Sequence, residues 1–240
     1  MLAVIFVAAL IQSAFGFGSA LIAVPLLALR IPLETVTPLV VLASITMSTI
    51  VVIQDWKKIH FRSAGWLVFS TFFGIPLGLL LLTSNHQKEV KAVLGVLIIG
   101  FSLYALFGPA PLELKRDSTA WLLACGFFAG ILGGAFGING PPLAIYGAMR
   151  RWSAQHFRAT LQGYFLPASI LGMASFWLDG LWTRAVTHYY LIALPALLLG
   201  VFLGREINHR LRGDVFLKYI YAGMICIGAL LLVQVTRAKL

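Results

Sequence analysis

Charged residues are scarce in this 240-residue chain. They make up 11% of the sequence, against 60% for hydrophobic residues, whereas an ordinary soluble domain carries about 25% charged residues. A soluble globular protein is therefore excluded, and apolar runs long enough to cross or half-cross a bilayer recur almost from end to end. These runs are continuously apolar rather than alternating, which favours helices over the strands of a membrane barrel. We expect an all-α polytopic membrane protein without a soluble domain.

Acidic residues are the scarcest charged type, with 8 Asp and Glu against 18 Lys and Arg. None of them lies in the middle of an apolar run, so the buried carboxylates that proton relays use are missing. The same absence disfavours a cation carrier. The net charge of +10 does not indicate nucleic-acid binding, because the basic residues occupy short loops where the positive-inside rule accounts for them.

The chain also lacks the motifs of enzymes and metal proteins. No HExxH, phosphate-binding loop or Ser–His–Asp arrangement occurs, and the five histidines have no metal-ligand spacing. We therefore expect no enzymatic activity, no metal and no cofactor. The two cysteines, Cys125 and Cys226, lie within apolar runs and are expected to be small buried residues rather than a disulfide.

Two interrupted apolar segments are the most informative feature that the sequence does have. The stretch from Gly133 to Pro142 reads GGAFGINGPP, and a shorter copy, AFGFGS from Ala14 to Ser19, is followed by Pro25. Glycine and proline at this density cannot continue a helix, yet the flanking sequence is apolar enough for lipid. Irregular backbone at that depth must be shielded by protein or line a cavity. A broken segment in each half of a chain is typical of the binding site of a secondary transporter.

Eight apolar segments are expected, in two groups of four. They are Leu2–Leu29, Thr35–Ile53, Ala64–Leu82, Glu89–Phe107, Thr119–Met149, Phe157–Leu178, Thr183–Leu203 and Phe216–Val235. The first is broken near Gly16–Ser19 and the fifth at the glycine stretch. Three helix-breaking residues (Gly108, Pro109 and Pro111) indicate that residues 108–118 form a linker. The linker would join an N-terminal transmembrane repeat at 1–107 to a C-terminal one at 119–240.

The two halves correspond beyond the breaks. Gly74 and Gly78 of the third segment match Gly200 and Gly204 of the seventh, and Thr37 of the second matches Thr160 of the sixth. The glycines at 95 and 100 likewise match those at 223 and 228, where tight helix packing is the favoured role. Matches that keep their order along the chain indicate an internal duplication.

Charge distribution favours one of two topologies. If the first and fifth segments cross fully, the 18 Lys and Arg residues divide 10 to 8 between the two sides. If both segments are re-entrant, entering and leaving on one face, the second half is inverted and twelve of the 18 collect on one side. The positive-inside rule favours this second arrangement. The run Leu2–Phe15 also makes only about 21 Å of helix, short of a hydrocarbon core of about 30 Å. A broken helix that crosses at a tilt is the alternative.

A half-helix that begins inside the membrane offers an anion site. It presents free backbone N–H groups and the positive end of its dipole. If Ala20–Leu29 and Leu143–Met149 are such half-helices, their N-termini lie at Gly18-Ser19 and Gly140-Pro141. Ser19 and Asn139 would add side-chain donors, and Pro141 or Pro142 suits a first helical turn. The alternative for these glycines is tight helix packing, which does not call for two adjacent prolines.

Neutral polar residues near the breaks are further candidates. They are Gln12, Ser13, Thr37, Ser44, Tyr146, Thr160, Gln162 and Tyr164. Taken singly, each is more often a helix–helix hydrogen-bond partner than a ligand. Thr37 and Thr160 stand out because they occupy matching positions in the two halves. Arg158, two residues before Thr160, is a candidate counter-charge for an anion.

The paired motifs resemble a known family. Gly16–Ser19 followed by Val24-Pro25-Leu26-Leu27, and Gly137–Gly140 followed by Pro141-Pro142-Leu143, are similar to the motifs of the sulfite exporter TauE/SafE family of membrane transporters. The resemblance covers nearly the whole chain. It implies a bacterial inner-membrane permease for sulfite, thiosulfate or organosulfonates such as sulfoacetate. The residues that it assigns to the substrate site are Gly16, Gly18, Pro25, Thr37, Gly137, Gly140, Pro141, Pro142 and Thr160.

We therefore expect a secondary transporter that binds a small anion between the two broken segments and exposes it alternately to each side. Membrane lipid and the anion are the expected partners, without nucleic acid. A coupling proton or ion and a homo-oligomer are left open. The alternatives are an anion channel with the same site and a permease for another small organic anion. A membrane-embedded enzyme or a scaffold subunit is a rival of a different class.

Overall fold

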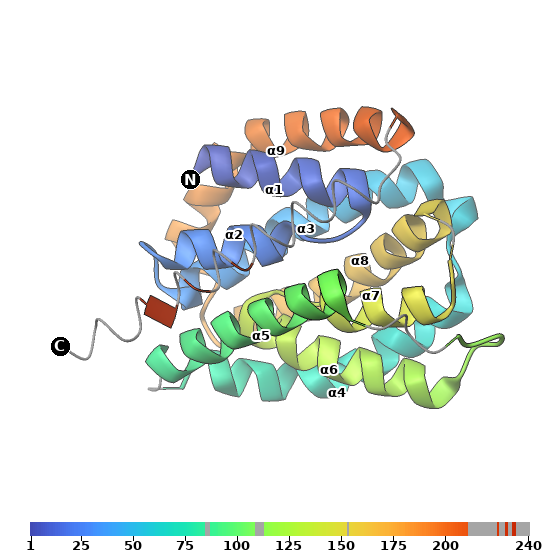
Figure 1. Cartoon of the computed structure of the whole chain (residues 1–240). Coiled ribbons are helices and arrows are strands. Elements are labelled where there is room, and N and C mark those ends of the chain that lie inside the picture. The colour runs from blue at the N-terminus through green and yellow to red at the C-terminus, as the bar shows by residue number, and fades with distance from the viewer. Residues whose placement is uncertain are drawn as a thin grey trace.

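The structure is a computed structural model that describes residues 1–84, 87–108, 113–152 and 154–210, with the isolated positions 225, 229, 232 and 233. All regular elements in these residues are helices, which confirms the all-α prediction (Figure 1). They are α1 (Leu2–Phe15), α2 (Ser19–Ala28), α3 (Leu33–Asp55), the short η1 (Trp56–Lys58), α4 (Phe61–Leu82), α5 (Gln87–Phe107), α6 (Thr119–Phe136), α7 (Gly140–Met149), α8 (Ala154–Leu178) and α9 (Arg184–Arg210). The predicted eighth segment, Phe216–Val235, falls almost entirely outside the described residues, as do linker residues 109–112.

Helix lengths agree with a chain that crosses a membrane several times. Within the described ranges, four helices are long and apolar enough to span: α3 together with η1, α4, α6 and α9. The predicted ends of the second, third, fourth and sixth segments fall within three residues of helices α3, α4, α5 and α8. α9 continues seven residues beyond the predicted end at Leu203, to Arg210. The extension is charged rather than apolar, and it includes Arg and Glu, which are good helix formers.

Both predicted helix breaks are present. α1 ends at Gly16, where φ is 87° and the N–H donates to the carbonyl four residues earlier at 2.7 Å. α6 ends in the same way at Gly137, with φ of 67° and a bond of 2.8 Å. Glycine adopts this left-handed conformation without steric cost, which is why it commonly ends helices. The chain becomes helical again at Ser19 for α2 and at Gly140 for α7.

The chain folds back at each break. Figure 1 shows α2 running back toward the edge of the bundle where α1 begins, and α7 running back toward the edge where α6 begins. The two pairs start from opposite edges of the bundle. α1 contacts α2, and α6 contacts α7.

The first helix of each half packs on a helix of the other half. α1 lies along α9, and α6 lies along α4. A Cβ added at Gly74 or Gly78 of α4 would lie 2.2 Å from a backbone carbonyl oxygen of α6, and one added at Gly204 of α9 would lie 2.4 Å from the carbonyl oxygen of Leu10 in α1. These glycines let two helix backbones approach closely, as small residues do in membrane proteins. The pairs matched between the halves in sequence thus hold equivalent contacts in the fold.

Candidate functional site

The two breaks meet at one small hollow inside the bundle. Five predicted site residues line it, namely Gly18, Ser19, Gly137, Asn139 and Gly140. Gln12 of α1, Ser44 of α3 and Phe165 of α8 complete much of the wall. The breaks also touch directly, since a Cβ added at Gly140 would lie 3.2 Å from Cδ2 of Phe17. The hollow has a volume of about 20 Å³, roughly the room that one water needs.

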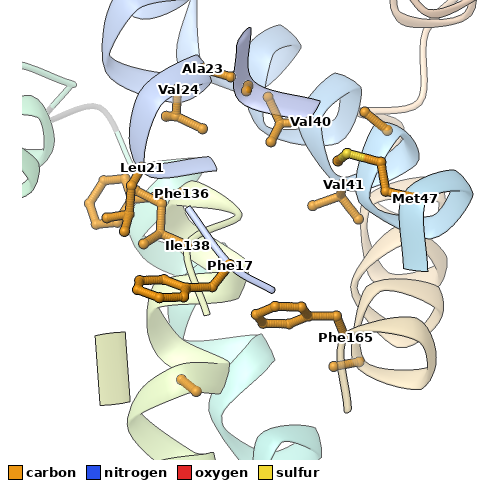
Figure 2. Close-up of a cluster of buried hydrophobic side chains, with 14 of the residues drawn as sticks. Phe17, Leu21, Ala23, Val24, Val40, Val41, Met47, Phe136, Ile138 and Phe165 are labelled. Carbon is orange, nitrogen blue, oxygen red and sulfur yellow. The ribbon is translucent and has the colours of Figure 1, made fainter. Parts of the chain in front are cut away.

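Apolar side chains surround this polar hollow. Figure 2 shows Phe17 and Leu21 from the first break, Phe136 and Ile138 from the second, and Phe165 from α8. All five side chains are buried. They exclude water from the site, and a low local dielectric strengthens any hydrogen bond made there.

A chain of buried amides and hydroxyls holds the first break. Gln162 Nε2 donates to the carbonyl oxygen of Gly16 at 2.8 Å, and Gln162 Oε1 accepts from Ser48 Oγ at 2.7 Å. Gln12 Nε2 lies 3.4 Å from the same Oε1, and Ser19 Oγ donates to Gln12 Oε1. The predicted residue Gln162 therefore acts on the backbone of the break, and Gln12 connects it to the hollow.

The second break has its own polar contacts. Asn139 Nδ2 donates to the Tyr164 hydroxyl at 3.3 Å, and this hydroxyl is 2.7 Å from Thr71 Oγ1. The Asn139 amide lies over Gly133, where an added Cβ would be 2.7 Å from Oδ1. Thr37 packs beside the break: its Cγ2 would lie 3.7 Å from a Cβ at Gly137, and its buried Oγ1 has no hydrogen-bond partner among the described residues.

The two helix N-termini are not equivalent donors. The first N–H groups of a helix have no acceptor within it, and α2 begins with Ser19, Ala20 and Leu21, all of which carry an N–H. α7 begins with Gly140 followed by Pro141 and Pro142, and proline has no N–H. At the second break, the groups that could donate a hydrogen bond to an anion are therefore the backbone N–H of Gly140 and the side-chain amide of Asn139.

Several predicted site residues lie away from the hollow. Pro141 and Pro142 line an apolar groove between α5, α6 and α7, so their observed role is to begin α7. Pro25 is buried within α2, beyond the residues that line the hollow. Thr160 Oγ1 accepts a hydrogen bond from the backbone N–H of His60 at 3.0 Å. Thr37 and Thr160 match in sequence but have different contacts.

Gly16 packs against Arg158 rather than on the hollow. A Cβ added at Gly16 would lie 2.7 Å from Cα of Arg158. The Arg158 side chain is only 4% exposed, although the residue is in the second turn of α8. The sequence predicts Arg158 as a candidate counter-charge for an anion, but its burial depends on packing against Gly16, which no local pattern reveals.

A second polar cluster ties the linker to the bundle. Asp117 Oδ1 accepts hydrogen bonds from the Tyr146 hydroxyl and from Arg150 Nε, both at 2.9 Å, and its Oδ2 accepts from Ser63 Oγ at 3.1 Å. Partial burial raises the pKa of Asp117, but these hydrogen bonds and the charge of Arg150 outweigh it, so the pKa lies below its ordinary value. The cluster holds the carboxylate charged.

The described helices place the chain in the class of multi-pass helical membrane proteins. It matches the sulfite exporter TauE/SafE family over residues 1–232 and belongs to that family. Because the family consists of transporters, the prediction that the chain is not an enzyme is confirmed. A curated relative from Cupriavidus necator, a probable sulfite/organosulfonate exporter TauE, is 26% identical over 234 residues, covering 95% of this chain and 90% of the relative. No solved structure gives a match.

Proposed function

We propose that this protein is a secondary transporter of small sulfur-containing anions, such as sulfite, thiosulfate or organosulfonates. The anion binds in the hollow where the two breaks meet, and the protein exposes it alternately to each side. Family membership and the name of the curated relative support the substrate class. We infer that the protein lies in the bacterial inner membrane.

The convergence of both breaks on one hollow carries this proposal. The hollow combines the N-terminal end of α2 with the Ser19 hydroxyl and the Asn139 amide. Helix N-termini attract anions through free N–H groups and the helix dipole. None of the described residues that line it is a carboxylate, so this part of the wall does not repel a negative charge.

The small size of the hollow supports alternating access over an open channel. A volume of about 20 Å³ holds roughly one water, which is too little for a sulfur oxyanion with three oxygens. The anion therefore enters only after the breaks move apart. We propose that the two fold-backs are re-entrant hairpins of an inverted repeat, which would put each of them in contact with a different side of the membrane.

Transport in proteoliposomes tests the proposal. Purified protein should give saturable sulfite uptake with counterflow, which a channel does not show. Asn139→Leu removes the second amide hydrogen, which is not used toward Tyr164, and Ser19→Ala removes a hydroxyl that would turn from Gln12 to the anion. Because a hydrogen bond to a charged group contributes about 1.5–3 kcal/mol, we expect sulfite affinity to fall by about 10- to 100-fold.

Ser102→Ala is the matched control. Ser102 is buried, but its hydroxyl donates to the carbonyl oxygen of Ile98 in its own helix and lies outside the hollow. This variant should transport normally. Normal transport by both hollow variants would contradict the proposed site. Conduction without saturation or counterflow would favour a channel.

A further inference from the structure

Arg158 carries a buried charge that the described part of the chain pairs only weakly. Its side chain is only 4% exposed, and within the described ranges it forms an ion pair from Nη1 to Asp55 Oδ2 at 3.4 Å. Asp55 is also shared, because its Oδ1 pairs with Lys58 Nζ at 3.1 Å. The remaining two guanidinium nitrogens of Arg158, Nε and Nη2, are buried and have no hydrogen-bond partner among the residues that the structure describes. Burying a charge costs several kcal/mol unless it is paired.

The two unpartnered nitrogens form one edge of the guanidinium. Nε–H and Nη2–H point in the same direction, and this edge makes the side-on, two-bond contact with the oxygens of a planar or pyramidal oxyanion. A carboxylate, sulfite or sulfonate supplies two oxygens at the matching spacing. The long contact to Asp55 lies on Nη1 and leaves this edge free.

Arg158 is connected to the hollow along one face of α8. Arg158, Gln162 and Phe165 are spaced i, i+4 and i+7, so their side chains share a face of the helix. The stem of Arg158 lies against Gly16, Gln162 holds the Gly16 carbonyl, and Phe165 lines the hollow. A rise of 1.5 Å per residue separates Arg158 from Phe165 by roughly 10 Å.

We propose that Arg158 forms a second binding site for the transported oxyanion, separate from the hollow, at the end of the bundle where α3 ends and α8 begins. The inference rests on the proposed function. The oxyanion pairs with the Nε and Nη2 edge before it reaches the hollow, and Asp55 holds the guanidinium in its absence. Lys57, Lys58 and Arg62 follow Asp55 closely in the chain, so positive charge near this end of the bundle would attract anions.

Kinetics of sulfite transport by Arg158 variants test this role. In proteoliposomes, Arg158→Met should raise KM for sulfite by about 10-fold or more, since two charge-assisted hydrogen bonds are lost. We expect a smaller change in kcat. Arg158→Lys should recover only part of the affinity, because an ammonium group cannot make the side-on contact. Asp55→Asn should lower KM, because the competing carboxylate is neutralised.

Stability separates this role from a structural one. In detergent without sulfite, Arg158→Met should melt at or above the temperature of the wild-type protein, because an apolar side chain replaces a poorly paired buried charge. The stabilisation that a given sulfite concentration gives the wild-type protein should be reduced in this variant. If the Arg158–Asp55 ion pair serves only to stabilise the fold, Arg158→Met and Asp55→Asn should both melt at lower temperatures, and the KM for sulfite should not change. That result would overturn the inference.

The hollow variants distinguish failure of this inference from failure of the proposed function. If Ser19→Ala and Asn139→Leu impair transport while Arg158→Met keeps the wild-type KM, only the proposed binding site at Arg158 is refuted. If the wild-type protein transports no sulfur oxyanion, both proposals fail.

Discussion

Replacement of Gly16 by alanine tests the contact that positions the first break. The new Cβ would lie 2.7 Å from Cα of Arg158 and 3.1 Å from its Cβ, which is closer than two carbon atoms normally approach. Gly16 also has φ of 87°, a conformation that costs an L-residue about 1–2 kcal/mol. Overpacking adds about 1–3 kcal/mol. We therefore expect Gly16→Ala to lose roughly 2–5 kcal/mol, or roughly 5–15 °C in melting temperature.

Alanine variants of two other glycines separate the backbone cost of positive φ from the cost of overpacking. Gly180 also has positive φ, at 72°, but no described atom lies within 4 Å of an added Cβ, so Gly180→Ala measures the backbone cost alone. Gly172 lies within α8, where an added Cβ would meet no described atom within 4 Å, and Gly172→Ala should stabilise the protein by about 0.5–1 kcal/mol. Tryptophan fluorescence during heating in one detergent measures all three. Gly16→Ala should also impair transport, because the Gly16 carbonyl is held by Gln162. Equal melting temperatures for Gly16→Ala and Gly180→Ala would refute the close approach.

Two further predictions concern other contacts. Gly78→Ala puts a Cβ 2.2 Å from a carbonyl oxygen of α6 and should greatly reduce the yield of folded protein in detergent. Gly100→Ala should not, because its Cβ would meet no atom of the described residues within 4 Å. Asp117→Asn should lower stability by about 1 kcal/mol, because Tyr146 and Arg150 lose a charged acceptor. The folded pKa of Asp117 lies below its ordinary value of 3.8, so its contribution is present above that pH and is lost as pH falls through the lowered pKa. A melting-temperature series against pH should show this acid loss in the wild-type protein and less of it in Asp117→Asn.

The breaks could be predicted because their cause is local. Glycine and proline act on the backbone of their own segment, so Gly16 and Gly137 are recognisable without any neighbour. The partners of the packing glycines could not be predicted in this way. Gly74 and Gly204 indicate that something approaches closely, but which helix approaches depends on how the halves assemble.

Side-chain roles at the site show the same limit. Thr37 and Thr160 match in sequence, yet the Thr160 hydroxyl is occupied by the N–H of His60, a contact between distant parts of the chain. Pro141 was expected to serve the site, and it faces an apolar groove instead. The burial of Arg158 follows from the packing of α8 on the first break, which periodicity alone does not reveal.

The exchange of neighbours between the halves has a consequence for assembly. α1 packs against α9, and α6 packs against α4. Each half therefore contributes one helix to each of these two helix pairs. If the gene were divided within the linker, each fragment would expose the helix faces that normally pack against the other half. The two fragments should therefore fold only when they are made together.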